Sequence, residues 1–202
     1  MGVLVSGRGT NLRALVEASC RPEYPAEVVA VASNRAACPA LALARDLGLA
    51  ARAFPATEHG GDAELRDQAM ASWLLAEGCS LLVLAGYDRI LTAPLLTAFP
   101  QRILNLHNSL LPAFSGTMRA VEQALAHGVK ITGCTVHLVS PDLVDGGPIV
   151  LQAAVEVRDD DTPDTLLARI HEQEWRILPE AVRLLSLGQL RVEGRRVLRA
   201  GS

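Results

Sequence analysis

The chain has 202 residues, half of them hydrophobic, and a formal net charge of −3. This length predicts one large domain over residues 1–202 with a substantial core, and this charge gives no general attraction to nucleic acid or anionic lipid. The four cysteines form no CxxC pair, no apolar run is long enough to span a membrane, and no signal peptide is recognised, so we expect a cytoplasmic protein.

Short apolar runs alternate with helical patterns along the chain. In chain order we predict strand 2–5, helix 11–18, strand 28–32, helix 38–47, strand 51–54, helix 63–76, strands 81–85 and 103–107, helix 117–126, strands 135–139 and 150–157, helix 163–187 and a hairpin at 190–198. Thr162 is the predicted N-cap of the last helix, with Pro163 at its first position. This alternation predicts an α/β fold with a mainly parallel central sheet.

A glycine-rich turn, Ser6-Gly7-Arg8-Gly9-Thr10-Asn11-Leu12, joins the first strand to the first helix. Glycine lets a ligand approach the backbone closely, and the amides at a helix start favour an anion. Thr10 and Asn11 add side-chain donors, so we predict a phosphate as the ligand, although Leu12 stands where a GxGxxG motif needs its third glycine. In the alternative interpretation, Thr10 or Asn11 merely caps the helix. The turn alone gives both interpretations equal weight.

Two polar residues, Asn105 and His107, end the predicted strand at 103–107. Alternate side chains of a strand share a face, so these two point the same way, about 7 Å apart. An amide and an imidazole at such a place suit the stabilisation of a developing oxyanion and the handling of a proton. The pair therefore predicts the chemistry of acyl-type transfer.

A sharp turn, Asp142-Leu143-Val144-Asp145-Gly146-Gly147-Pro148, precedes the strand predicted at 150–157. If the Asp145 carboxylate lay near His107, it would favour the charged imidazolium. The alternative is a turn aspartate that bonds its own backbone, and the pattern by itself favours that alternative.

Glu174 lies on the apolar stripe of the last predicted helix, four residues after Ile170 and three before Ile177. An inward carboxylate is costly unless something bonds it, and a ligand with hydroxyl or amine donors would do so. The equally weighted alternatives are a partner arginine, Arg169 or Arg176, and an opening that leaves Glu174 in solvent.

Several other polar residues are not predicted to act in a site. No histidine pair has metal-ligand spacing, so we expect no metal. His137 is assigned as a structural strand residue, and His59, His127 and His171 to loops or exposed helix positions. Ser109 lacks the Gly-x-Ser-x-Gly pattern of a serine nucleophile.

Together these segments resemble the folate-dependent formyltransferase superfamily, and within it the phosphoribosylglycinamide formyltransferase family of purine synthesis. The resemblance runs nearly from end to end, and the glycine-rich opening turn distinguishes the glycinamide ribonucleotide branch. The segments that carry it are residues 6–12, 33–35, 84–91, 105–114, 133–137, 145–149, 168–170 and 173–174.

This resemblance implies a single α/β domain with helices on both faces of the sheet and a Rossmann-like N-terminal half. It implies an enzyme that moves the formyl group of its co-substrate, 10-formyltetrahydrofolate, to the primary amine of glycinamide ribonucleotide. Those two small molecules are the implied partners, without nucleic acid, membrane or metal, and the chain is implied to be a monomer or a homodimer.

The resemblance also implies roles for residues at matching positions. Asn105, His107 and Asp145 match the family's catalytic residues. Gly9, Thr10 and Asn11 match the loop that holds the substrate phosphate, and Glu174 matches a carboxylate that contacts the same substrate. The residues that match the folate pocket are Arg89, Ile90, Leu91, Asn105, Pro141, Asp142, Leu143 and Val144.

Some positions depart from the family pattern. Asn108 stands in place of proline, Asp88 in place of methionine and Trp175 in place of histidine, and the region 58–64 lacks an expected arginine. These departures bear on folate affinity or tail-length preference more than on the reaction type.

Three other functions stay open at this point. One is hydrolysis of 10-formyltetrahydrofolate, and another is formyl transfer to a different acceptor such as methionyl-tRNA, although we expect this chain to have no room for the extra domains of those enzymes. The third is a regulator that binds folate or nucleotide without catalysis, against which the presence of Asn105, His107 and Asp145 counts.

Overall fold

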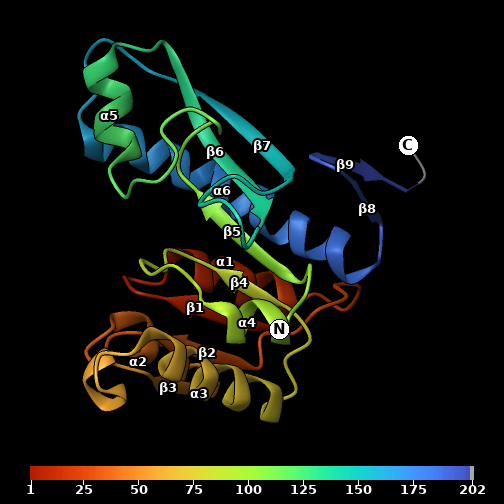
Figure 1. Ribbon diagram of the computed structural model, residues 1–202. Coiled ribbons are helices and arrows are strands. Elements are labelled where there is room, and N and C mark those ends of the chain that lie inside the picture. The colour runs from red at the N-terminus through yellow and green to blue at the C-terminus, as the bar shows by residue number, and fades with distance from the viewer. Residues whose placement is uncertain (201–202) are drawn as a thin grey trace. The chain divides into compact units, whose positions relative to one another are not determined.

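A computed structural model describes residues 1–200, and their contacts divide the chain into two compact units, residues 1–103 and the residues from 104 onward (Figure 1). The prediction that residues 1–202 form a single domain stays a prediction. The two units differ in the way that their strands pair.

The first unit is a parallel sheet with the strand order β3-β2-β1-β4. Its elements are β1 (Gly2–Val5), α1 (Thr10–Ser19), β2 (Ala30–Ser33), α2 (Pro39–Asp46), β3 (Ala50–Ala53), the 3₁₀ turn η1 (Ala56–His59), α3 (Ala63–Ala76), β4 (Leu82–Leu84) and α4 (Ala93–Ala98). Crossovers between parallel strands are right-handed. Helices α1 and α2 connect β1 to β2 and β2 to β3, in the same direction across the sheet, so they cover one face. Helix α3 connects β3 to β4 in the opposite direction, so it covers the other face.

Burial explains why these short strands form. All residues of β1, β2 and β4 are buried, as expected for parallel strands covered on both faces. The carboxyl ends of β1, β2 and β4 lie at the same edge of the sheet, where the order reverses on either side of β1. Ligands of such sheets bind at this kind of edge, so the glycine-rich turn after β1 is well placed for one.

The second unit is built on β5 (Ile103–His107), β6 (Ile131–Leu138) and β7 (Ile149–Glu156), which pair antiparallel in that order. A C-terminal hairpin of β8 (Leu190–Glu193) and β9 (Arg196–Arg199) joins the sheet through a parallel pairing of β9 with β7. Helix α5 (Ala120–His127) and the long helix α6 (Pro163–Ser186) complete the unit, with α6 packed on β6 and β7.

Helix α6 begins at the predicted residue. Thr162 is its N-cap: its hydroxyl accepts from the Thr165 backbone N–H at 3.2 Å, the Thr165 hydroxyl accepts from the Thr162 N–H at 2.9 Å, and Pro163 takes the first helical position. The sequence signal of cap followed by proline therefore placed this terminus correctly.

The predicted α/β fold with a mainly parallel sheet, helices on both faces and a Rossmann-like N-terminal half is confirmed, and most elements agree within three residues. Two elements, helix α4 and η1, were missed. Helix α5 begins at Ala120, three residues later than predicted, and the predicted start of β6 at 135 was wrong, because the strand begins at Ile131. The start of β6 was not predicted because Gly133 interrupts the strand pattern in the sequence. The β7 backbone approaches closely at this position, since an added Cβ would lie 1.9 Å from the Ala153 carbonyl oxygen.

Candidate active site

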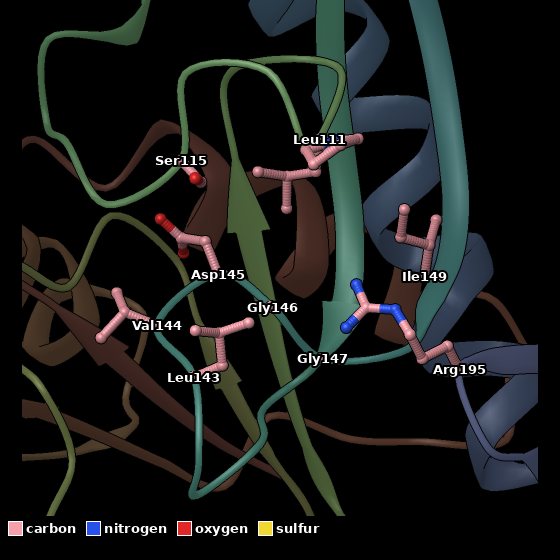
Figure 2. A pocket seen from close by; sticks show the side chains of 10 residues that line it. Leu111, Ser115, Leu143, Val144, Asp145, Gly146, Gly147, Ile149 and Arg195 are labelled. Atoms are coloured by element: carbon pink, nitrogen blue, oxygen red, sulfur yellow. The ribbon is translucent and has the colours of Figure 1, made fainter.

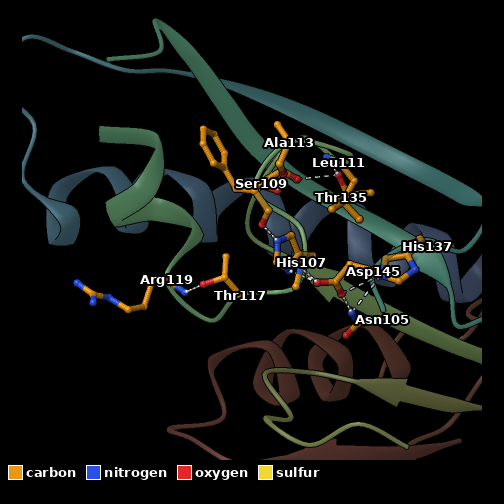
Figure 3. Close-up of polar contacts among 12 residues, drawn as sticks. Asn105, His107, Ser109, Leu111, Ala113, Thr117, Arg119, Thr135, His137 and Asp145 are labelled. Atoms are coloured by element: carbon orange, nitrogen blue, oxygen red, sulfur yellow. Dashed lines mark hydrogen bonds and ion pairs between the residues drawn. The ribbon is translucent and has the colours of Figure 1, made fainter. Parts of the chain in front are cut away.

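Three of the predicted site residues meet in the second unit (Figure 3). Asn105 and His107 lie on one face of β5 because they are two residues apart. The Asn105 Nδ2 donates to Asp145 Oδ1 at 3.1 Å, and the His107 Nδ1 lies 3.4 Å from Asp145 Oδ2. The structure thus brings an amide, an imidazole and a carboxylate together from two segments of the chain, and their catalytic role stays a prediction.

The Asp145 carboxylate is held from a third segment as well. Its Oδ2 accepts the Gly116 backbone N–H at 2.8 Å, so it bonds the loop after β5 rather than the backbone of its own turn. Asp145 adopts a left-handed conformation with φ 51°, and Phe114 in that loop has φ 54°. Such a conformation costs a non-glycine residue about 1–2 kcal/mol, and it persists at functional sites where the surroundings fix it.

The two nitrogens of the His107 ring both face acceptors. Nε2 lies 2.9 Å from the Phe114 carbonyl oxygen, which can only accept, so Nε2 carries a proton. Nδ1 faces the Asp145 carboxylate. The ring therefore lies between two acceptors, a carbonyl oxygen and a carboxylate.

A second histidine, His137, lies in the site although its strand pattern indicated a structural role. His137 stands opposite Asn105 on β6, and its Nε2 lies 3.1 Å from the Asn105 Nδ2. Its Nδ1 lies 2.9 Å from the Leu138 carbonyl oxygen. The same Nε2 lies 3.7 Å from the Asp145 Oδ1, so the His137 ring faces both the Asn105 amide and the Asp145 carboxylate. Sequence reasoning missed this residue, and the signal available was its place two residues after Thr135 on a strand next to β5.

Charge and burial oppose each other at Asp145. Burial would raise the pKa of the carboxyl group, but the His137 side chain, the Gly116 amide and the charge of His107 together outweigh it and lower the pKa below its ordinary 3.8. Asp145 therefore stays ionised at neutral pH beside the ring of His107.

Buried hydrogen bonds brace the loop that follows β5. The Thr135 hydroxyl donates to the Ser109 carbonyl at 2.7 Å and accepts the Leu111 N–H at 3.0 Å. The Gln152 amide donates to the Leu111 carbonyl at 3.0 Å, so β6 and β7 both hold the loop. This bracing fixes the stretch that carries the Phe114 carbonyl.

A small pocket opens beside Asp145 (Figure 2). Its lining includes Leu111 from the braced loop, Leu143 and Val144 from the turn before Asp145, and Arg195 from the C-terminal hairpin. Leu143 is 56% exposed and Val144 50%, which is unusual for large apolar side chains and typical of a surface that a ligand covers.

In the first unit, the glycine-rich turn leads straight into α1. Gly9 is the N-cap with φ 85°, and an added Cβ would lie 2.9 Å from the Ala40 Cβ, so both its conformation and its surroundings require glycine. No side chain caps α1, so the alternative in which Thr10 or Asn11 caps the helix is wrong. The first amides of α1 remain suited to an anionic ligand.

Glu174 is buried on α6, with 3% of its surface exposed. Its Oε2 lies 2.7 Å from the His171 Nδ1, which excludes the solvent-filled opening considered above. The two candidate arginines bond elsewhere, since Arg169 pairs with Asp161 and Arg176 donates to Gln173. His171 is therefore half-buried beside Glu174, so its assignment to an exposed helix position was wrong.

Comparison with known proteins decides the family. The profile described as formyl transferase matches residues 1–182. The chain is 42% identical over 193 residues to phosphoribosylglycinamide formyltransferase from Mycobacterium tuberculosis, covering 96% of this chain and 87% of that one. The chain belongs to this formyl transferase family.

Two further relatives are a solved structure of similar length and a much longer protein. The crystal structure of glycinamide ribonucleotide transformylase 1 from Symbiobacterium toebii is 48% identical, with a TM-score of 0.94 over 98% of this chain and 92% of that one. The trifunctional purine biosynthetic protein adenosine-3 of Gallus gallus is 40% identical over 192 residues, and the match spans 95% of this chain and 19% of that protein. The resemblance predicted from the sequence is confirmed.

The segment of the first unit that is predicted to bind folate presents one exposed and one buried side chain. Ile90 is 69% exposed whereas Leu91 is buried. The next residue, Thr92, is fixed by the fully buried Asp67, whose Oδ2 accepts the Thr92 N–H at 2.7 Å and its hydroxyl at 2.8 Å. The buried Arg66 donates to Asp67 at 2.8 Å and completes the brace.

The departure at Asp88 has a structural explanation. Its Oδ1 accepts from the Asn34 amide at 2.8 Å and from the Ser6 hydroxyl at 3.0 Å, and its Oδ2 pairs with Arg35. Burial would raise the pKa of Asp88, but these donors outweigh it and lower the pKa. Asp88 thus joins the ends of β1, β2 and β4. Nothing in the structure explains Asn108 in place of proline.

No helix within residues 1–200 has the length and apolar character needed to cross a membrane. The same residues contain no cluster of three or more His, Cys, Asp or Glu side chains able to hold a metal ion, and their four cysteines are free.

Proposed function

We propose that this formyltransferase moves the formyl group of 10-formyltetrahydrofolate to the primary amine of glycinamide ribonucleotide, a step of purine synthesis. The observation that carries the proposal is the meeting of Asn105, His107 and Asp145, in a chain of this family, beside a pocket with exposed apolar walls. The acceptor substrate comes to this chain from the names of its relatives.

The chemistry needs no covalent enzyme intermediate. The neutral amine of the substrate attacks the formyl carbon, a C–N bond forms, and the formyl oxygen takes the negative charge of a tetrahedral intermediate. The bond between that carbon and the folate N10 then breaks. One proton leaves the attacking nitrogen and one reaches the departing N10, so the reaction is balanced without an oxidant or a further reactant.

The His107 imidazolium is suited to stabilise the negative oxygen. A donor aimed at a developing oxyanion contributes about 3–4 kcal/mol to lowering the barrier. The Nε2–H of His107 now points at the Phe114 carbonyl, 2.9 Å away, and Asn105 donates to Asp145. One of these hydrogen bonds therefore has to pass to the substrate oxygen as the intermediate forms.

Asp145 has two tasks in this proposal. Its lowered pKa makes it a carboxylate throughout the neutral range, so its negative charge attracts a cationic donor 3.4 Å away at His107 Nδ1. It also accepts the proton that the attacking nitrogen loses and returns it toward N10, directly or through a water molecule.

The remaining predicted contacts supply binding. We assign the substrate phosphate to Gly9, Thr10 and Asn11 at the start of α1, and a further contact of the same substrate to Glu174. Folate is assigned to Arg89, Ile90 and Leu91 and to residues 141–144 with Asn105. A cytoplasmic location, and a state of monomer or homodimer, belong to the same proposal.

The direct test is to incubate the protein with 10-formyltetrahydrofolate, with and without glycinamide ribonucleotide, and to quantify the formylated ribonucleotide by mass spectrometry. Formyl loss that requires the ribonucleotide, with one formylated product for each formyl group lost, supports the proposal. Equal loss without the ribonucleotide indicates a hydrolase, and binding of folate without turnover indicates a regulator; either result overturns it.

A further inference from the structure

A histidine and a carboxylate form a pair on α6, outside the group of Asn105, His107 and Asp145. Glu174 is almost completely buried, and its Oε2 is 2.7 Å from the Nδ1 of His171, one helical turn earlier. Residues three apart on a helix are neighbours, so the contact is local to α6 and is fixed as soon as the helix forms.

The ring of His171 is itself held in place. It stacks on Trp175 with ring centroids 6.1 Å apart and an angle of 9° between the planes. Offset stacking of this kind is favourable and restricts the rotation of both rings. Trp175, one of the positions that depart from the family pattern, therefore supports the His171 ring from the same helix.

The environment of Glu174 is unfavourable for a mobile charge. Helix α6 packs on β6, where burial together with the charge of Glu174 raises the pKa of Cys134 to about 12. A carboxylate at such a place is stable only with donors directed at it. His171 supplies one of them, and a carboxylate with about four acceptor positions can accept a ligand hydroxyl at the same time.

We propose that His171 is a positioning residue: its Nδ1–H holds the Glu174 carboxylate in the orientation in which it accepts hydrogen bonds from the ribose hydroxyls of the substrate. The proposal rests on the proposed function, because Glu174 is assigned to the substrate there. Trp175 contributes by stacking on the His171 ring and restricting its rotation.

The test uses variants that separate the donor from the shape of the side chain. In His171→Asn the amide nitrogen occupies the place of Nδ1, His171→Leu has nearly the same shape without a donor, and His171→Gln puts the amide one bond further, at the place of Nε2. The matched control is Glu172→Gln, a charge change at an exposed position of the same helix. Equal melting temperatures establish that a variant is folded.

The substrate is varied as well. Glycinamide ribonucleotide and its analogue without ribose hydroxyls are compared by calorimetric Kd and by steady-state KM and kcat. We expect His171→Leu and His171→Gln to raise Kd and KM for the ribonucleotide about tenfold, the effect of one ordinary hydrogen bond. We expect His171→Asn to stay within about threefold of wild type, and kcat and the KM for 10-formyltetrahydrofolate to change less than about twofold.

Two results would overturn the inference while leaving the proposed function intact: an unchanged Kd in His171→Leu and His171→Gln, or an equal loss for the analogue without ribose hydroxyls. Absence of ribonucleotide-dependent transfer in the wild-type protein would overturn the proposed function instead. If His171→Leu does not fold, the comparison of His171→Asn with His171→Gln decides the question.

Discussion

Replacing Asp145 with asparagine keeps the shape of the side chain and removes its charge. The carboxylate Oδ2 lies 3.4 Å from the His107 Nδ1, and both side chains are about nine-tenths buried. Two unit charges at 3.4 Å attract by about 5 kcal/mol at an effective dielectric constant of about 20. In the proposed mechanism His107 acts as a cationic donor, and Asp145→Asn removes the negative charge that attracts such a donor.

The hydrogen bonds change in the same direction. Asp145 now accepts from Asn105 at 3.1 Å and from the Gly116 N–H at 2.8 Å. An asparagine has one oxygen and one NH₂ group, so one of those donors would face another donor. If the new NH₂ group turned toward His107 instead, it would donate to Nδ1 and favour the neutral ring.

We therefore expect Asp145→Asn to lower kcat by about 10²–10⁴-fold, the range that a positioned acid–base group contributes. The Kd of glycinamide ribonucleotide should change less than about threefold, because Asp145 is assigned to the chemical step and not to phosphate binding. Single-turnover formation of the formylated product measures the first quantity and calorimetry the second. Asp160→Asn, the same change at an exposed position, is the matched control. A kcat within threefold of wild type in a folded Asp145→Asn protein would refute the role.

Three further predictions concern stability. Asp67→Ala should lower the free energy of unfolding by about 3–5 kcal/mol in urea titrations, because it leaves the buried Arg66 charge without its partner; a loss under 1 kcal/mol would contradict this. Thr162→Ala should cost about 1 kcal/mol through loss of the α6 cap, with no change in kcat. The pKa of Asp145 is lowered by folding, so the unfolded chain binds that proton first, and stability should fall as the pH drops below about 4. Asp145→Asn should flatten this fall, and an unchanged acid slope would argue against the shift.

Much of the fold could be predicted because local patterns and tertiary packing agree. The apolar run ending in Asn105 and His107 became β5 with the predicted bounds, and α3 also begins and ends where its pattern does. Thr162 marked a helix start by its own hydrogen bonds, which depend on the next few residues only. Helix α4 was missed because its six residues are too few to show a period.

The site was less accessible to such reasoning. Asn105 and Asp145 were each identified from the sequence. They are 40 residues apart along the chain, and no local pattern predicts that their side chains meet. The sequence alone favoured a turn aspartate at 145, and only the family resemblance favoured the contact. His171 shows the opposite case: its partner is one helical turn away, and the i, i+3 spacing was a signal that could have been used.

The two histidines of the site show why residue type alone does not give a chemical role. His107 faces an acceptor at each nitrogen, the Phe114 carbonyl and the Asp145 carboxylate. His137 faces the Leu138 carbonyl at Nδ1 and, at Nε2, the Asn105 Nδ2 at 3.1 Å and the Asp145 Oδ1 at 3.7 Å. The two rings thus contact different partners around the same Asp145 carboxylate. Phe114 and Asp145, which hold His107, both adopt the left-handed conformation, so local conformational preference opposes this arrangement. The hydrogen bonds of Thr135 and Gln152 to the loop after β5, together with the contacts of Asp145, stabilise it. The placement of His107 between two acceptors therefore depends on tertiary contacts across three strands, and weakening any of them should disturb that placement.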